Sequence, residues 1–367
     1  MSLIKLNEIG SEFWFEKTNG NHNNLDSEYL SFGSEQKFLF SGRTAIWYVL
    51  NDILSKKNIK SAYLPNYICD SVVQPFNDLN LEINYYSVKF IDGEVKYEID
   101  KDIKADVFVS MSYFGFNATN MDSIIQAFQK SNIIVIEDIT HRLFSNPNHS
   151  PAADYFIASL RKWMPLISGG LAIKKNGSFA NIPLHKPPLK MIKQRREAML
   201  LKRNYLLGNH TYNFEKNKFL ALYKAANENL EDNYIGYEID YESIETLKTY
   251  DIEKLIKKRK QNADFLLKNI LTLSIIEPLI NQFDYEQDCP LFVPVVVRDK
   301  LKNSLKNALI ENGIYLPTHW PIKDTNDKEL ISLVNSELSL VCDQRYDFEE
   351  MKDIIKQIEN FDEPSNK

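Results

Sequence analysis

The most informative stretch of this chain is Asp154-Tyr-Phe-Ile-Ala-Ser159-Leu-Arg-Lys162-Trp-Met-Pro-Leu-Ile-Ser-Gly169-Gly170. It predicts a short strand over Phe156–Ser159, a loop that presents Lys162, a Gly-Gly turn, and a second strand over Leu171–Lys175. A lysine at the end of a strand is well placed to form a Schiff base, as enzymes that use pyridoxal phosphate (PLP) require. By itself the motif is a weak signal, because most lysines are solvated surface charges.

A second strand end supports the same interpretation. The segment Ile133-Ile-Val-Ile-Glu137-Asp138 predicts an apolar strand that ends in two acids. Strands and helices alternate here, which predicts an α/β layer with a largely parallel sheet. In such sheets ligands bind beyond the carboxyl ends of the strands, so Asp138 and Lys162 are expected to converge. The other predicted elements are helices over Ile46–Leu54, Cys69–Asp78 and Asp122–Lys130, and strands over Ser61–Leu64, Ile83–Val88 and Ala105–Phe114.

The same pattern predicts three parts in this chain of 367 residues. Residues 1–35 form an N-terminal arm, residues 36–242 a large PLP-binding domain, and residues 243–367 a smaller α+β C-terminal domain. In the small domain we expect a long connecting helix over Ser243–Asn269 and a strand over Leu291–Val297. A further helix should end at Gly313, and the last helix should begin with a capping box at Asp347.

Composition and charge exclude several classes of protein. The formal net charge of -6 argues against a nucleic-acid-binding protein, which would show a basic excess. No apolar run approaches the roughly 20 residues that a membrane-spanning helix needs, and the N-terminus lacks the pattern of a signal peptide. The three cysteines have no disulfide or metal-ligand spacing, so neither a disulfide framework nor a metal site is indicated. We therefore expect a globular, cytoplasmic protein.

PLP chemistry sets a short list of demands, and the chain has a candidate for each. The cofactor needs a lysine amine, a carboxylate beside its pyridine nitrogen, donors at a helix N-terminus for its phosphate, and an aromatic ring over its plane. Lys162 supplies the amine and Asp138 the carboxylate. The other candidates are the phosphate donors Ser41, Gly42, Arg43, Thr44 and Ser159, the ring-stacking Tyr67 and Tyr113, and His141 for the phenolic oxygen.

Each candidate also has an ordinary structural explanation, which would be preferred for that residue alone. Asp138 could cap the segment after it, and Ser41 to Thr44 could be a simple helix N-cap. The basic run around Arg195 and Arg196 is expected to be a solvated helix face, with binding of a phosphorylated substrate as the alternative. Core or loop positions would explain Tyr67, Tyr113, His141 and His319. The order and spacing of the candidates favour the joint functional interpretation.

In this order the motifs resemble those of the DegT/DnrJ/EryC1/StrS sugar aminotransferase family, whose members have fold type I of the PLP-dependent enzymes. The similarity covers most of the chain, from about Phe40 to the C-terminal helix. The matching segments are Ser41-Gly42-Arg43-Thr44-Ala45-Ile46, Leu64-Pro65-Asn66-Tyr67, Tyr113-Phe114-Gly115, Glu137-Asp138-Ile139-Thr140-His141, Ser159 through Gly170, Gly313-Ile314, Thr318-His319-Trp320 and Asp343-Gln344-Arg345-Tyr346.

The resemblance implies a homodimer with active sites at the subunit interface and PLP as the cofactor. It implies transfer of an amino group, usually from glutamate, to a keto sugar carried on a nucleotide. Lys162 would first hold the cofactor as an aldimine and then move the proton between substrate and cofactor. His319 would lie on the substrate side, and Tyr237 in the segment through which the partner subunit reaches the cofactor.

Three departures from the family pattern leave other functions open. Ser159 lies three residues before Lys162 instead of five, Arg43 replaces the usual Thr, and Glu238 replaces the Asn of a Gly-Tyr-Asn segment. One alternative is a PLP-dependent transaminase or related enzyme that acts on a non-sugar keto compound. The other is a non-catalytic protein that keeps the fold for binding or regulation.

Overall fold

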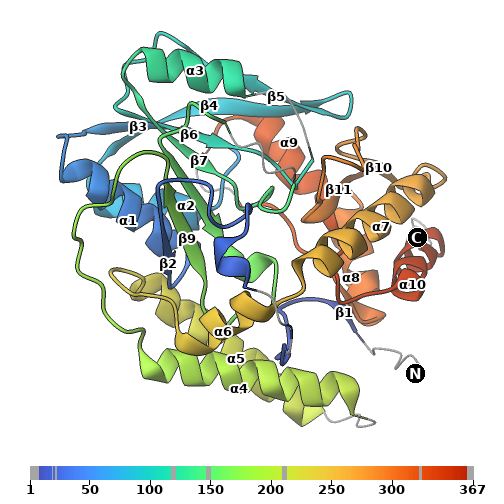
Figure 1. Cartoon of the computed structure of the whole chain (residues 1–367). Helices are drawn as coiled ribbons and strands as arrows, with labels where there is room; N and C mark the ends of the chain where they lie inside the picture. The colour runs from blue at the N-terminus through green and yellow to red at the C-terminus, as the bar shows by residue number, and fades with distance from the viewer. Residues whose placement is uncertain are drawn as a thin grey trace.

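The main feature of the molecule is an eight-stranded sheet (Figure 1). The computed structural model describes residues 8–18, 20, 23–116, 121–145, 150–208, 213–321 and 325–361. The strand order is β2-β9-β8-β7-β6-β3-β4-β5. The strands are β2 Glu35–Leu39, β3 Ser61–Pro65, β4 Glu82–Ile91, β5 Glu94–Glu98, β6 Val107–Met111, β7 Ile134–Asp138, β8 Tyr155–Ser159 and β9 Gly170–Lys174. Pairing is parallel from β8 through to β4, whereas β9 and β5 pair antiparallel with their neighbours.

The parallel strands end close together at one edge of the sheet. Asp138, the last residue of β7, pairs with Met111 at the end of β6 and with Ile157 of β8. Residues Val135 to Asp138 are all buried, as expected for a parallel strand that is covered on both faces. The strand ends therefore bring Asp138 and the loop after Ser159 to the same edge, as the sequence predicted.

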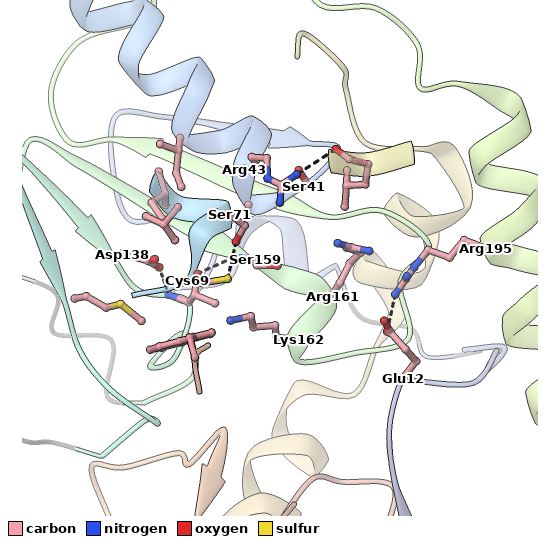
Figure 2. A pocket seen from close by; sticks show the side chains of 18 residues that line it. Glu12, Ser41, Arg43, Cys69, Ser71, Asp138, Ser159, Arg161, Lys162 and Arg195 are labelled. Carbon is pink, nitrogen blue, oxygen red and sulfur yellow. Dashed lines mark hydrogen bonds and ion pairs between the residues drawn. The ribbon is translucent and has the colours of Figure 1, made fainter. Parts of the chain in front are cut away.

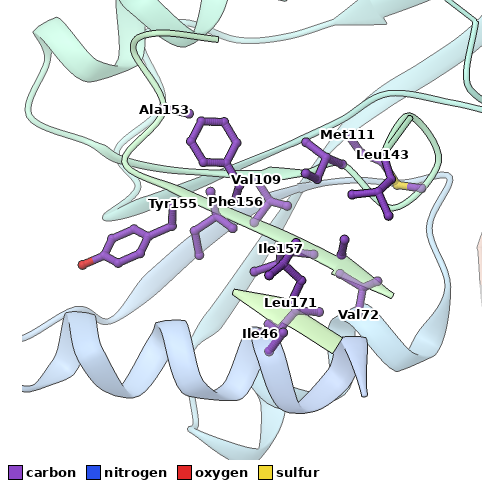
Figure 3. Close-up of a cluster of buried hydrophobic side chains, with 14 of the residues drawn as sticks. Ile46, Val72, Val109, Met111, Leu143, Ala153, Tyr155, Phe156, Ile157 and Leu171 are labelled. Carbon is purple, nitrogen blue, oxygen red and sulfur yellow. The ribbon is translucent and has the colours of Figure 1, made fainter. Parts of the chain in front are cut away.

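Helix α1 (Gly42–Leu54) begins at this edge and packs on β8 and β9. Its predicted apolar stripe faces the sheet, and Figure 3 shows Ile46 beside Ile157 and Leu171 in the buried core. Burial of this stripe holds the helix against the sheet, which fixes where its N-terminus lies. Helix α2 (Asp70–Asp78) packs beside β4, and helix α3 (Asp122–Lys130) beside β7.

Two long helices, α4 (Leu189–Leu207) and α5 (Asn213–Asp232), lie side by side along the lower edge in Figure 1. The predicted solvated face on α4 is wrong for Arg195, whose side chain is 8% exposed. Its guanidinium is held by an ion pair with Glu12 and lies 5.4 Å from the ring centroid of Tyr223. Arg196, one residue later, is 43% exposed and fits the solvated-face prediction.

The C-terminal part contains a three-stranded antiparallel sheet, β10-β11-β13, with helices packed against it. The expected single helix over Ser243–Asn269 is wrong, because the chain forms two helices, α6 (Tyr241–Thr249) and α7 (Ile252–Ile270). Tyr250 between them is extended, and the Asp251 carboxylate caps α7 by accepting from the Lys254 N–H at 2.9 Å. The remaining elements are β10 Ile276–Pro278, β11 Phe292–Val297, α8 Lys302–Glu311, α9 Lys328–Ser336, β13 Glu337–Val341 and α10 Phe348–Glu359, the last with the predicted capping box.

The N-terminal segment is tied into the rest of the molecule. Strand β1 (Ile9–Gly10) pairs in parallel with β12 (Ile314–Tyr315) of the C-terminal part. Ile9 and Trp14 are buried among that part's apolar side chains. Further along, the Phe15 N–H donates to the Met199 carbonyl of α4 at 3.1 Å, and a 3-10 turn, η1, covers Asn24–Asp26. The predicted α/β fold with a mostly parallel sheet is thus confirmed, while the three-part division stays a prediction.

Candidate active site

A cavity of about 280 Å³ lies where the N-terminus of α1, the ends of β7 and β8, and helix α4 meet (Figure 2). Its volume is near the lower end of the range of about 300–1,000 Å³ found for small-molecule sites. Among the predicted site residues, those in the cavity lining are Ser41, Gly42, Arg43, Asp138, Ser159 and Lys162. Those outside the lining are Thr44, Tyr67, Tyr113, His141, Tyr237 and His319.

Lys162 is carried by a short 3-10 helix, η2 (Leu160–Lys162), directly after β8. The next residue fixes this turn, because the backbone N–H of Trp163 donates to the Leu160 carbonyl at 3.0 Å. The Trp163 indole N–H also donates to the Thr140 carbonyl at 2.7 Å, which ties the turn to the end of β7. In Figure 2 the Lys162 side chain extends into the cavity. The strand, loop and second strand of the motif are therefore present as predicted.

The amine of Lys162 lies 3.4 Å from Nε2 of His141. Nδ1 of His141 accepts a hydrogen bond from the Phe114 backbone N–H at 3.1 Å, so the proton of the neutral ring is assigned to Nε2. Burial lowers the pKa of His141 well below its usual range, and the nearby charge of Lys162 adds to this effect. The ring is therefore neutral. It can hydrogen-bond to Lys162 only when Lys162 is a neutral amine, which is the nucleophilic form.

Asp138 is a buried carboxylate, 2% exposed, at the end of β7. Its Oδ1 accepts the Thr140 backbone N–H at 2.8 Å, so it does cap the segment after it, as the structural explanation expected. Burial raises the pKa of Asp138, and the hydrogen bonds from Thr140 and the charge of Lys162 only partly oppose this. A carboxylate in this state is stabilised by a cationic partner in the cavity. Both explanations of Asp138 are thus compatible with the geometry.

The hydroxyl groups of Ser41 and Thr44 are used within the protein. Thr44 Oγ1 donates to the Tyr234 carbonyl at 2.8 Å and therefore accepts from the Ser41 hydroxyl at 2.9 Å. Ser41 Oγ in turn accepts the Thr44 backbone N–H at 3.1 Å, which makes Ser41 the N-cap of α1. The donors that remain at this helix end are the backbone N–H groups of Gly42 and Arg43, which have no partner within a helix.

Two glycines allow the start of α1 to lie against the lysine motif. A Cβ atom on Gly170 would lie 2.0 Å from the backbone oxygen of Ser41, a distance that no side chain could adopt. A Cβ atom on Gly42 would lie 3.0 Å from the Cβ of Ser159. The absence of side chains at these positions therefore brings the helix N-terminus to the loop that carries Lys162.

Trp320 supplies an aromatic ring to the cavity wall, and the Lys162 amine lies 5.9 Å from its ring centroid. Tyr67 and Tyr113 are fully buried behind it. The Tyr67 hydroxyl donates to the His319 carbonyl at 2.8 Å, and the Tyr67 ring lies 5.0 Å from that of Trp320. These two tyrosines and His319 therefore support the turn that carries Trp320, and their side chains do not face the cavity.

Tyr237 and Arg196 lie away from the cavity lining. The Tyr237 ring packs 6.0 Å from that of Phe40, and the Tyr237 carbonyl accepts the Phe40 N–H at 3.1 Å. Arg196 forms an ion pair with Glu242 at 2.7 Å. Within this chain neither residue reaches the Lys162 amine, so a role for Tyr237 would require a second subunit.

The cavity also contains charged residues that the sequence did not predict as a group. Glu12 of the N-terminal segment, Arg161 of η2 and Arg195 of α4 all line it. Arg161 immediately precedes Lys162 but belongs to no motif of its own, and Arg195 lies in a basic run whose pattern predicts a solvated helix face. No pattern in the sequence marked Glu12. The Nε atoms of Arg43, Arg161 and Arg195 are buried and have no hydrogen-bond partner among the described residues.

Two kinds of feature are absent from the part of the chain that the structure describes. There, no group of three or more His, Cys, Asp or Glu side chains is arranged to hold a metal ion. No helix in the same residues is long and apolar enough to cross a membrane.

No family model matches this chain, and no curated protein matches it in sequence. Several solved structures match in fold. Spr1654 from Streptococcus pneumoniae, in its PMP form, has a TM-score of 0.65 at 14% identity and covers 96% of this chain and 97% of its own. Helicobacter pylori PseC, an aminotransferase involved in the biosynthesis of pseudoaminic acid, has a TM-score of 0.63 at 14% identity, with 96% and 98% covered.

A third structure is more distant in sequence. The aminotransferase TlmJ from Streptoalloteichus hindustanus has a TM-score of 0.60 at 10% identity, with 92% of this chain and 88% of TlmJ covered. At such low identities the likeness establishes the fold. The chain therefore has the fold of these aminotransferases over nearly its whole length, with the large sheet and the smaller C-terminal part both included.

Proposed function

We propose that this protein is a PLP-dependent aminotransferase that transfers an amino group from glutamate to a nucleotide-linked keto sugar. The observation that carries the proposal is the placement of the Lys162 amine and the buried Asp138 carboxylate on one cavity, at the N-terminus of α1. The fold adds support, because its solved relatives include PseC and TlmJ, which are aminotransferases. Spr1654, with the same fold, was solved in PLP and PMP forms.

The residues of the cavity fit PLP. Asp138 would hold the pyridine nitrogen, because a buried carboxylate favours a protonated, cationic ring. The backbone N–H groups of Gly42 and Arg43, with the Arg43 guanidinium, would hold the phosphate, since Arg43 Nε is buried without a partner in the described structure. Ser159 and Trp320 would complete the walls around the ring.

Bound PLP would act as the electron sink of the reaction. Lys162 would provide the amine that attaches the cofactor and, once released, the base that moves a proton at the substrate carbon. His141 holds its Nε2 3.4 Å from the Lys162 amine and so helps to position it. Asp138 would keep its negative charge beside the ring throughout.

The proposal also covers the acceptor substrate and the oligomeric state of the enzyme. The likeness to Spr1654, which is described as a putative sugar aminotransferase, supports a sugar acceptor. We propose a cytoplasmic homodimer in which Tyr237, which lies outside its own cavity, contributes from the partner subunit. A keto acid acceptor is the second candidate, favoured by the two guanidinium groups of Arg161 and Arg195 in the cavity.

The test is a visible absorption spectrum of the purified protein with added PLP, before and after glutamate. The wild type should show the band of PLP bound to a lysine, and glutamate should remove it. Lys162→Ala should keep the fold but lose this band, because among the described residues that line the cavity Lys162 alone carries an amine.

A matched control is Lys190→Ala, which changes a lysine on α4 that does not line the cavity. This variant should behave as the wild type. A band that survives in Lys162→Ala, or a wild type that gives no band at all, would overturn the proposal. Turnover with keto sugars against keto acids then separates the two acceptor classes.

A further inference from the structure

The N-terminal segment delivers a carboxylate to the cavity. Glu12 lies two residues after strand β1, and its Oε2 accepts a hydrogen bond from Nη2 of Arg195 at 2.8 Å. Figure 2 shows this pair at one end of the cavity, with the Arg161 side chain between it and Lys162. Among the described residues of this segment, Glu12 lines the cavity, whereas Glu16, four residues further along, lines a different cavity.

The two arginines form a site with more positive charge than Glu12 neutralises. Burial alone would raise the pKa of Glu12, but Arg195 and then Arg161 lower it to about 2, so the carboxylate is charged near neutral pH. Burial and the charge of Arg195 lower the pKa of Arg161 to about 9, with Glu12 opposing. Over the whole lining, four cations (Arg43, Arg161, Lys162 and Arg195) face two carboxylates (Glu12 and Asp138).

Arg195 is also held in place independently of Glu12. Its Nη1 donates to Asn227 Oδ1 at 3.2 Å, and its guanidinium lies over the Tyr223 ring. The Nε atoms of Arg195 and Arg161 are both buried and lack a partner among the described residues. A fixed guanidinium with unused donors is suited to a planar carboxylate, because the fork of N–H groups matches its two oxygens.

We propose that Arg161 and Arg195 bind the carboxylate of the amino donor, and that Glu12 occupies this site when no donor is present. The inference rests on the proposed function, because it takes the donor to be an amino acid. Arg161 and Lys162 line the same cavity, so a carboxylate held by Arg161 keeps the amino group of the same molecule in the cavity with the lysine amine. Glu12 acts as an internal substitute for the donor's carboxylate, and the donor must displace it.

The test measures binding of glutarate, a dicarboxylate that has no amine and cannot react. Titration calorimetry on the full-length protein with added PLP compares the wild type with Glu12→Gln and Arg195→Gln. Glu12→Gln should bind glutarate about tenfold more tightly, because a competing carboxylate is removed. Arg195→Gln should bind it at least about tenfold more weakly.

Glu16→Gln is the matched control, since it changes a carboxylate of the same segment that lies outside the cavity, and its affinity for glutarate should equal that of the wild type. Thermal melting of each variant shows that it is folded. The absorption band of the wild type is recorded first, so a missing band overturns the proposed function. Glutarate binding by the same sample still tests the arginine site.

Two outcomes would overturn the inference. If Glu12→Gln binds glutarate with unchanged or lower affinity, Glu12 only positions Arg195 and does not compete with a ligand. Uridine diphosphate serves as a second probe, because a diphosphate could also use two guanidinium groups. If Glu12→Gln tightens binding of uridine diphosphate and not of glutarate, the site belongs to the nucleotide and the assignment to the donor is wrong.

Discussion

The two ends of the cavity are built in different ways. The strand-end side, formed by Asp138, Ser159 and Lys162, comes from residues at the ends of neighbouring parallel strands and on the loop after one of them. The arginine side, formed by Glu12, Arg161 and Arg195, joins a segment near the N-terminus to α4 and η2. The first side depends on the large sheet and on the turn directly after β8, whereas the second exists only when distant parts of the chain are packed together.

This difference separates two functions that the cavity would need. Residues that hold a cofactor must keep one geometry, and the sheet supplies a rigid base for them. Residues that admit and release a substrate benefit from lying outside that base, and the ion pair between Glu12 and Arg195 involves no residue of the large sheet.

The strand-end side should carry the largest loss of activity. Asp138→Asn keeps the shape of the side chain but removes its charge, so PLP should still bind while turnover falls by about 10²–10³-fold. Steady-state kinetics on the variant, with the absorption band as the check for bound cofactor, measures this. An unchanged turnover would show that Asp138 only caps the segment after it.

The clearest effect of pH on stability should come from Lys202, a buried lysine next to the arginine side. Lys202 of α4 is 1% exposed and donates to the carbonyl groups of Gly10 and Glu12. Burial, followed by the charge of Arg345, lowers the pKa of Lys202 from 10.5 to about 7. Between about pH 7 and the unfolded pKa of 10.5, the Lys202 side chain binds more protons in the unfolded chain than in the folded one. The free-energy cost of burying this side chain therefore decreases as the pH rises.

The wild type should therefore gain stability relative to Lys202→Met as the pH rises from 7 to 9, by on the order of 2 kcal/mol. Denaturant unfolding of both proteins at several pH values gives the difference in free energy of unfolding. A difference that is constant with pH would mean that Lys202 keeps its charge in the folded protein.

A single methyl group at the contact between β9 and the start of α1 should lower both stability and PLP binding. Gly170→Ala would place a Cβ 2.0 Å from the Ser41 backbone oxygen, so α1 or β9 must shift. We expect a loss of about 1–3 kcal/mol in the free energy of unfolding, together with weaker PLP binding. Gly177→Ala is the control for crowding, because nothing lies within 4 Å of its added Cβ, although its φ of +74° is itself unfavourable for alanine.

The smallest effect is expected for the arginine next to the site. Arg196→Gln breaks a half-exposed pair with Glu242, which should cost less than about 1 kcal/mol and leave glutarate binding unchanged. Since Arg195 and Arg196 are neighbours in sequence, this variant separates the arginine side from general effects of positive charge on α4. Weaker glutarate binding in Arg196→Gln would show that the anion site extends beyond the cavity.

Much of the fold could be predicted because its signals are local. The Ser41 cap, the stripe from Ile46 and the strand ending at Asp138 each lie within a few residues of the feature that they determine. The expected helix over Ser243–Asn269 failed for a local reason as well. The apolar spacing continues through Tyr250, but Asp251 offers a new N-cap, and capping of α7 there competes with a continuous helix.

The site was predictable only on its strand-end side. Alternation of strands and helices places Asp138 and Lys162 at one edge whatever the rest of the chain does. The sequence predicts that Tyr67 and Tyr113 stack on a cofactor, and this role stays a prediction. Both rings are buried behind Trp320, and sequence order does not say which aromatic of a cluster faces outward. Glu12 could not be found, since its place depends on the pairing of β1 with β12, more than 300 residues away.

The attachment of β1 has a consequence for anyone who shortens this protein. A chain trimmed to begin at residue 13 would keep every strand of the large sheet and every residue of the strand-end side. It would lose the β1–β12 pairing and the carboxylate beside Arg195 together. The buried Lys202 would also lose both carbonyl partners, so the truncation would change the charge balance around Arg195 as well as the packing of the C-terminal part.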